Sequence, residues 1–249
     1  MQEYIALSGG SLGFLMLSVF IAGVVRGFTG FAASAVVMAL GTVILAPIEL
    51  LPICLLLELT ASAFLIRGGI ADADYKLTIP LVGFAFAALP LGLYLSQTMD
   101  PELSKLVALA LVAGLAAMQL ARMTLPLGRG LGSSAFVGSL GGLIQGIAAV
   151  GGLVQALYIL ALNLPARTMR DTMILGVLFS GVIGLFWQVA MGVMTAQAVM
   201  LATLVLGPFA IGLWLGRRYF TPDNERFYRP ISLYILITLA GAGMLRHLL

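Results

Sequence analysis

Two charged residues lie inside long apolar stretches of the sequence, where a charge needs a chemical reason. Arg26 lies in the block from Ser11 to Ala46, and Glu58 is the eleventh residue of the block from Ile48 to Ile66. A charge at bilayer depth costs several kcal/mol unless it is paired or hydrated. An arginine offers a planar fork of donors for an anion, and a desolvated carboxylate can carry a proton. Substrate contact for Arg26 and proton coupling for Glu58 are one interpretation, and an ion pair between helices, or a Glu58 cap on a backbone break, is the other.

Arg26 belongs to a glycine-rich segment, GVVRGFTGFAAS, that has a counterpart, GGLIQGIAAVGG, later in the chain. Sliding the sequence by 119 positions lays Gly23, Gly27, Gly30, Ala32 and Ala33 on Gly142, Gly146, Ala149, Gly151 and Gly152. The same shift lays Arg26 on Gln145. Glycines weaken a helix, and small residues let a ligand approach the backbone. The candidate substrate-binding residues are therefore Arg26, Gly27, Thr29, Gly30, Ser34, Gln145, Gly146, Gly151, Gly152 and Gln155.

Close helix packing is the alternative role for these glycines, and we favour it for Gly23 and Gly142. Helices that begin after each segment would point backbone N–H groups and the positive end of the helix dipole at the same region, which suits an anion.

The composition shows whether this chain is surrounded by water or by lipid. Hydrophobic residues make up 61% of the 249 residues and charged residues only 9%, which is too little charge to cover a surface in water. The 13 basic residues, which give a net charge of +3, form no run of the kind that binds nucleic acid. Soluble enzymes, nucleic-acid binders and secreted disulfide domains are excluded.

Few residues offer metal or nucleophilic chemistry. Cys54 and His247 are the single cysteine and histidine, so no clustered Cys and His metal site and no intramolecular disulfide is expected. Ser34 has no histidine base in the sequence near it. We therefore expect no cofactor and no enzymatic activity. The first ten residues lack the basic region of a cleavable signal peptide, so the first apolar block is expected to remain in the mature protein.

Apolar blocks and the repeat predict an all-α polytopic membrane protein of 8–10 helical segments. A transmembrane helix needs about 20 apolar residues. Two blocks, Ser11 to Ala46 and Gly132 to Leu164, are longer, and each is expected to form a hairpin of two short helices, about 16 to 18 residues each, with an elbow within the membrane. Six blocks have ordinary spanning length: Ile48 to Ile66, Leu77 to Ser96, Leu103 to Arg122, Thr172 to Val193, Ala196 to Gly216 and Pro230 to Leu248.

The two halves are expected to be inverted-topology repeats, each a broken-helix hairpin plus three transmembrane helices. The predicted parts are an N-terminal repeat (1–122), a cytoplasmic linker (123–131) and a C-terminal repeat (132–249). Three spans and a returning hairpin make an odd number of crossings, which inverts the second copy. Basic residues in the loop Arg67 to Lys76 and in the linker predict that both are cytoplasmic, with both termini outside; Arg246 opposes this orientation.

At these residues the sequence resembles the TauE/SafE family of sulfite exporter-like membrane proteins. That family's motif reads G-x-x-x-G-x-x-G-x-G-G-G, and this chain departs from it with Ala32, Ala33 and Ser34 in the first copy and with Leu153 after Gly151 and Gly152 in the second. The resemblance implies transport of small sulfur-containing anions, such as sulfite or sulfonates like sulfoacetate, across a bacterial inner membrane.

The leading hypothesis is a secondary-active exporter of such anions, with substrate held at the midplane between the two elbows and protons as the coupling ion. Its partners are the substrate anion and the lipid bilayer, with no nucleic acid; the oligomeric state, a homodimer included, stays open. The alternatives are an anion channel or an uptake carrier for a related organic acid or oxyanion. An intramembrane enzyme or assembly factor is disfavoured.

Overall fold

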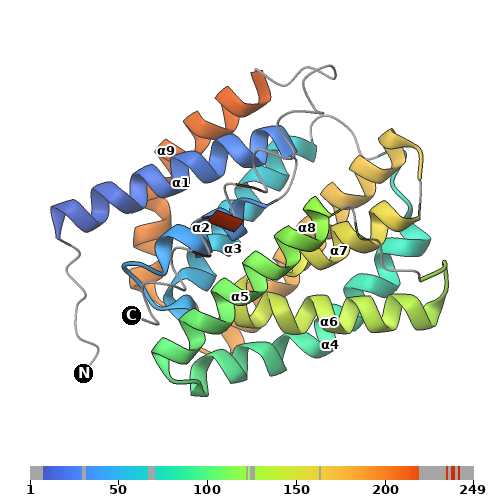
Figure 1. Ribbon diagram of the computed structural model, residues 1–249, viewed down its shortest axis with the longest axis horizontal. Helices are drawn as coiled ribbons and strands as arrows, with labels where there is room; N and C mark the ends of the chain where they lie inside the picture. Colours follow the sequence, from blue (N-terminus) through green and yellow to red (C-terminus); the bar gives the residue numbers. More distant parts are fainter. Residues whose placement is uncertain are drawn as a thin grey trace.

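The computed structural model describes most of the chain as helix (Figure 1). The described residues are 8–29, 32–66, 71–121, 123, 127–162 and 164–218, with isolated positions 234, 237, 238 and 241; the side chains of Phe28, Thr29 and Ala166 are not described. The helices are α1 (Gly9–Thr29), α2 (Ala33–Gly41), α3 (Pro47–Leu65), α4 (Tyr75–Thr98), α5 (Pro101–Leu120), α6 (Leu131–Ala148), α7 (Gly151–Ala161), α8 (Ala166–Ala190) and α9 (Ala196–Arg218).

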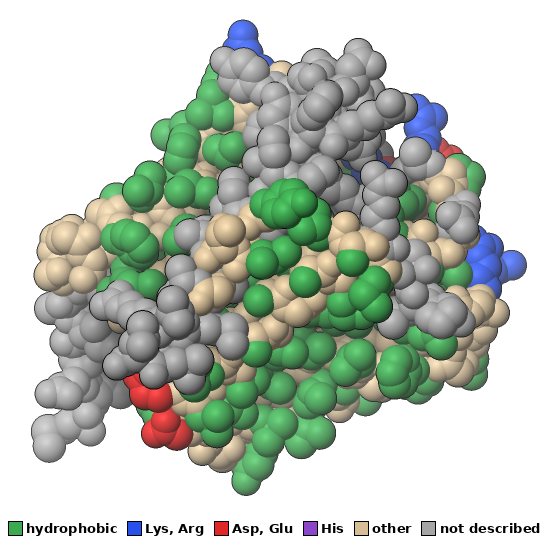
Figure 2. All heavy atoms as spheres, in the orientation of Figure 1, with side chains coloured by type: hydrophobic (Ala, Val, Ile, Leu, Met, Phe, Trp, Pro, Cys, Tyr) green, Lys and Arg blue, Asp and Glu red, His purple; other side chains and the backbone are tan. Residues whose placement is uncertain are grey.

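Seven of the described helices are long and apolar enough to cross a bilayer; α2 and α7 are shorter. Large hydrophobic side chains are exposed along the spanning helices, among them Ile79, Leu91 and Ile211. Figure 2 shows a face covered by hydrophobic side chains across its middle, with the charged side chains at its edges. Such an apolar surface faces lipid rather than water. The chain is an all-helical, multi-pass membrane protein, as the sequence predicts.

The predicted spans correspond closely to the helices. The five blocks that precede the last one coincide with α3, α4, α5, α8 and α9 to within a few residues. The last predicted span, Pro230 to Leu248, lies almost wholly outside the described residues. The division into repeats at 122 and 131 stays a prediction.

The expected hairpin arms of equal length are wrong. In the first hairpin α1 has 21 residues and α2 has 9, and in the second α6 has 18 and α7 has 11. The breaks lie late because the backbone enters the left-handed region at Ala32 (φ 72°) and Ala149 (φ 56°), while the helices continue through Gly27 and Gly146. Each first arm therefore spans the membrane, and each second arm is a short helix that begins at the elbow.

Glycines of α1 and α6 allow very close packing against helices from the opposite half. A Cβ built on Gly27 would lie 2.6 Å from the carbonyl oxygen of Leu213 in α9, and one built on Gly146 would lie 2.6 Å from that of Leu89 in α4. The first helix of each half thus packs along the third spanning helix of the other half. The two halves are interlaced.

These glycine contacts also show whether the packed helices run parallel or antiparallel. Along α1, Gly23 meets Phe209 and Gly27 meets Leu213, four residues further in both helices, so α1 and α9 run parallel. The residues of α6 that contact α4 advance in the same sense, so that pair is parallel too. In Figure 1, α1 runs from left to right and α6 from right to left. Equivalent helices of the two halves therefore point in opposite directions, as inverted repeats require.

The interlaced helices form two groups. We define body A as α1, α2, α3 and α9 and body B as α4, α6, α7 and α8; across this division α3 and α8 pack on each other as extensively as either packs on any one helix of its own body. The two bodies meet mainly where α3 packs on α8, and α5 contacts helices of both. The elbow of the first hairpin lies in body A and that of the second in body B.

Candidate functional site

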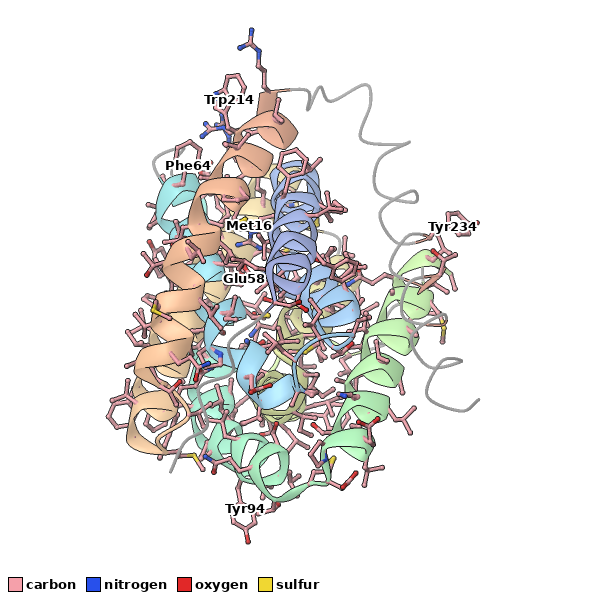
Figure 3. The ribbon with its side chains drawn as sticks, turned by 90° about the vertical axis from the view of Figure 1, so that its left-hand side faces the viewer. Met16, Glu58, Phe64, Tyr94, Trp214 and Tyr234 are labelled. Carbon is pink, nitrogen blue, oxygen red and sulfur yellow. The ribbon has the colours of Figure 1, made fainter. Side chains whose placement is uncertain are left out.

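A cavity lies where the two elbows meet, at the boundary between bodies A and B. Its volume is about 30 Å³. Body A lines it with residues of α1, α2 and α3, and body B lines it with residues of α6, α7 and α8. In Figure 3, Glu58 lies midway along the molecule, between Phe64 and Trp214 toward one end and Tyr94 at the other. The cavity is therefore at the depth where the elbows break the membrane helices.

Arg26 is a fully buried charge that faces this cavity. Its Nη2 lies 3.1 Å from Glu58 Oε2 and donates a hydrogen bond to Ser62 Oγ at 3.2 Å. Its Nε and Nη1 have no hydrogen-bond partner among the described residues. Buried donors are nearly always satisfied in proteins, so unpaired guanidinium N–H groups beside a cavity indicate a place for an acceptor.

Glu58 binds the first elbow and Arg26 at once. Ser34, the second residue of α2, donates to Glu58 Oε1 through its backbone N–H at 3.3 Å and through its hydroxyl at 3.0 Å. Oε2 lies next to Arg26 Nη2 but accepts no hydrogen bond of good geometry. The open question from the sequence is thus answered structurally: Arg26 and Glu58 are an ion pair, and Glu58 also caps the broken helix. Within this pair, Arg26 still lies in the wall of the cavity.

The second half presents an uncharged version of the same arrangement. Gln145, the counterpart of Arg26, accepts the N–H of Gly151 at 2.9 Å through Oε1 and so caps α7. Gln155 donates from Nε2 to Ser180 Oγ at 3.2 Å. The shift of 118 positions that aligns Pro47 with Pro165 also aligns Ser62 with Ser180. The cavity therefore combines one charged and one neutral wall.

The predicted site residues separate into three groups. The side chains or backbones of Arg26, Ser34, Gln145, Gly152, Gln155 and Glu58 line the cavity. Gly151 lines a smaller adjoining pocket beside Gln145 and Gln155, and Gly27 and Gly146 lie at helix contacts outside the cavity lining. Gly30 and the side chain of Thr29 lie outside the described residues.

Some lining residues were not predicted. Ser180 belongs to α8, far from either glycine motif, and only its alignment with Ser62 in the repeat could have revealed it. Apolar residues in a membrane chain carry no distinguishing signal, and those that complete the wall are Ala32, Ala35, Leu55, Ala149, Val150, Leu153, Val177 and Gly181.

Among the described residues, no three His, Cys, Asp or Glu side chains lie close enough together to hold a metal ion. A family model with the description "Sulfite exporter TauE/SafE" matches residues 15–244, which is nearly the whole chain. No curated protein and no solved structure matches it.

Proposed function

This chain belongs to the sulfite exporter TauE/SafE family, and we propose that it is a secondary-active exporter of small sulfur-containing anions whose binding site is the Arg26 cavity. The family implies membrane transport of sulfite or related sulfur anions. Sulfite and short organosulfonates such as sulfoacetate are the substrates proposed here, and the inner membrane of a bacterium is the proposed location.

The observation that carries this proposal is the state of the Arg26 guanidinium. It is fully buried, it faces the cavity, and its Nε and Nη1 lack partners. A sulfite or sulfonate group offers several oxygen atoms, each of which can accept a charge-assisted hydrogen bond from one of these N–H groups. A bound anion would satisfy donors that the protein leaves unsatisfied.

The opposite wall can hold the rest of such a ligand through neutral polar groups. Gln155 and Ser180 line the cavity, and the N–H of Gly152, the second residue of α7, has no acceptor within its own helix because of its position. The positive end of the α7 dipole favours an anion at the same place. The apolar remainder of the wall, including Leu55 and Val177, excludes water from these contacts.

Replacing Arg26 tests the assignment. We expect purified Arg26→Ala protein, reconstituted in vesicles, to lose uptake of labelled sulfite and sulfoacetate by at least about 100-fold, because the charge-assisted hydrogen bonds to the anion are removed. Arg26→Lys keeps the charge without the planar fork and should retain a small fraction of the activity. Arg129→Ala is the matched control, since Arg129 is exposed and pairs with Asp74 away from the cavity.

Ligand-induced thermal stabilisation in detergent separates binding from folding. Wild type should be stabilised by sulfite or sulfoacetate, and folded Arg26→Ala should not. Transport by Arg26→Ala at the wild-type rate would remove the cavity from the mechanism. Anion fluxes far above about 10³ per second would indicate a channel in place of a carrier.

A further inference from the structure

We propose that one proton travels with each monovalent anion, because the anion and the Glu58 carboxylate compete for Arg26. This inference rests on the proposed function and adds the coupling ion, the stoichiometry and the electrical character of the transport. Its basis is the pair of contacts made by Arg26 Nη2, to Glu58 Oε2 and to Ser62 Oγ, at the wall of the cavity.

The two oxygens of Glu58 have different surroundings, which identifies the one that takes the proton. Oε1 accepts two hydrogen bonds from Ser34. Oε2 accepts none and is held only by the charge of Arg26 at 3.1 Å. A proton added to Oε2 leaves both Ser34 bonds intact and removes the negative charge that Arg26 faces. Arg26 keeps its bond to Ser62 and is released toward the anion.

No other charge competes for this exchange in the described part of the chain. Arg26 on α1 is the charged partner, and Cys54, one turn before Glu58 on α3, is the nearby titratable group. The polar lining supplied by α2, α6, α7 and α8 is uncharged: Ser34, Gln145, Gln155 and Ser180. The remaining charged residues on the helices packed against α3 lie toward the ends of those helices: Lys76, Glu102, Lys105, Arg167, Arg170, Asp171, Arg217 and Arg218.

The charge balance then permits two forms of the site and disfavours the rest. Without substrate, Arg26 and ionised Glu58 sum to zero. With a monovalent anion and protonated Glu58 the sum is again zero. An anion bound without a proton leaves one net negative charge, and a proton bound without an anion leaves one net positive charge. An uncompensated charge is strongly disfavoured in a low-dielectric interior. The protein therefore switches between its inward-open and outward-open states only when the site is in one of the two neutral forms.

The result is movement of anion and proton together, with no net charge. Export proceeds whenever the product of proton and anion concentrations is higher inside than outside. The membrane potential neither drives nor opposes it, in contrast to an anion carried alone, whose export an inside-negative potential would favour.

Reconstituted full-length protein with labelled bisulfite or methanesulfonate, each of which carries a single negative charge, tests this directly. Ionophore-clamped vesicles allow the pH gradient and the voltage to be set separately. For wild type we expect a tenfold inward proton gradient to raise uphill anion accumulation about tenfold. A change in clamped potential from 0 to 100 mV should change the initial rate less than about twofold. Accumulation that follows the potential and ignores the pH gradient would overturn the proposal.

Glu58→Gln provides the decisive variant because glutamine resembles a permanently protonated glutamate. It should bind anion and exchange labelled for unlabelled anion at a rate within about threefold of wild type. Net transport should lose its pH-gradient dependence and become voltage-dependent, since the empty site now carries one positive charge. Glu49→Gln is the matched control on the same helix: Glu49 caps Ala46 at the start of α3, and this variant should behave as wild type.

The outcomes distinguish the two proposals. Absence of Arg26-dependent exchange of any sulfur anion would contradict the proposed function itself. Arg26-dependent exchange in wild type, combined with pH-gradient coupling that survives in Glu58→Gln, would leave the function standing and overturn the role of Glu58. If Glu58→Gln does not fold, the clamped wild-type measurement alone decides the charge balance.

Discussion

At the scale of single residues, the sequence identified the charged pair and not its partners. Arg26 and Glu58 stand out because bilayer-depth charges are rare and costly, so their type and position suffice as signals. Ser62 and Ser180 have no such signal, because a membrane helix accommodates a hydroxyl by bonding it to its own backbone. Only the three-dimensional contact of Ser62 with Arg26 shows that its hydroxyl accepts from a charged donor.

Ser62→Ala tests that contact. Removing the acceptor should weaken anion affinity, because Arg26 Nη2 loses the group that orients it; a hydrogen bond to a charged group is worth about 1.5–3 kcal/mol. We expect an increase of roughly tenfold in KM for sulfoacetate, with kcat nearly unchanged, measured as initial rates in vesicles. Ser104→Ala is the matched control, since Ser104 is equally buried and its hydroxyl has no partner among the described residues. Equal KM values for Ser62→Ala and Ser104→Ala would show that Ser62 does not position the guanidinium.

At the scale of elements, periodicity and composition predicted the spanning helices well and the elbows less well. Helix bounds follow from long apolar runs between polar loops, which the lipid requires. The position of a break depends on which residue adopts the left-handed conformation, and here alanines do so at Ala32 and Ala149. Glycines are the usual residues there, so the sequence pointed to the glycine-rich segments, and Gly27 and Gly146 were counted among the elbow residues. Those glycines serve the α1–α9 and α4–α6 contacts, which no single-helix pattern reveals.

Two glycine substitutions distinguish a glycine that packs between helices from one that lines the cavity. Gly27→Ala places a Cβ 2.6 Å from the Leu213 carbonyl oxygen, so we expect a loss of about 1–3 kcal/mol of stability, seen as a lower thermal midpoint in detergent. Gly152→Ala places its Cβ 3.9 Å from Val177, an ordinary contact, and should leave the midpoint unchanged. It narrows the cavity, however, so discrimination between sulfite and the larger sulfoacetate should shift toward sulfite. A Gly27→Ala protein as stable as wild type would contradict the packing role.

At the scale of the whole molecule, the repeat in the sequence does not coincide with the bodies in the structure. Inverted-repeat carriers commonly work by rocking one group of helices against another around a fixed site. If the moving groups were residues 1–122 and 132–249, the glycine-mediated contacts between α1 and α9 and between α4 and α6 would have to slide or separate. Those contacts include several of the tightest backbone approaches described in the protein. The cavity instead lies between bodies A and B, each of which takes one helix from the other half.

Cross-linking distinguishes these two divisions of the molecule. Two links can be chosen that both join the N-terminal half of the sequence to the C-terminal half. Only one of the two also joins body A to body B. Leu51 in α3 and Gln188 in α8 lie across the body boundary, where Gln188 Nε2 is 3.5 Å from the Leu51 carbonyl oxygen. Phe86 in α4 and Trp187 in α8 lie within body B, with ring centroids 5.3 Å apart.

Each pair is replaced by cysteines in a Cys54→Ser background and joined by a short reducible thiol reagent. We expect the Leu51–Gln188 link to stop anion transport until it is reduced and the Phe86–Trp187 link to leave the rate nearly unchanged. Loss of transport with both links would favour motion of the sequence halves, and full activity with both would show that neither boundary opens during transport.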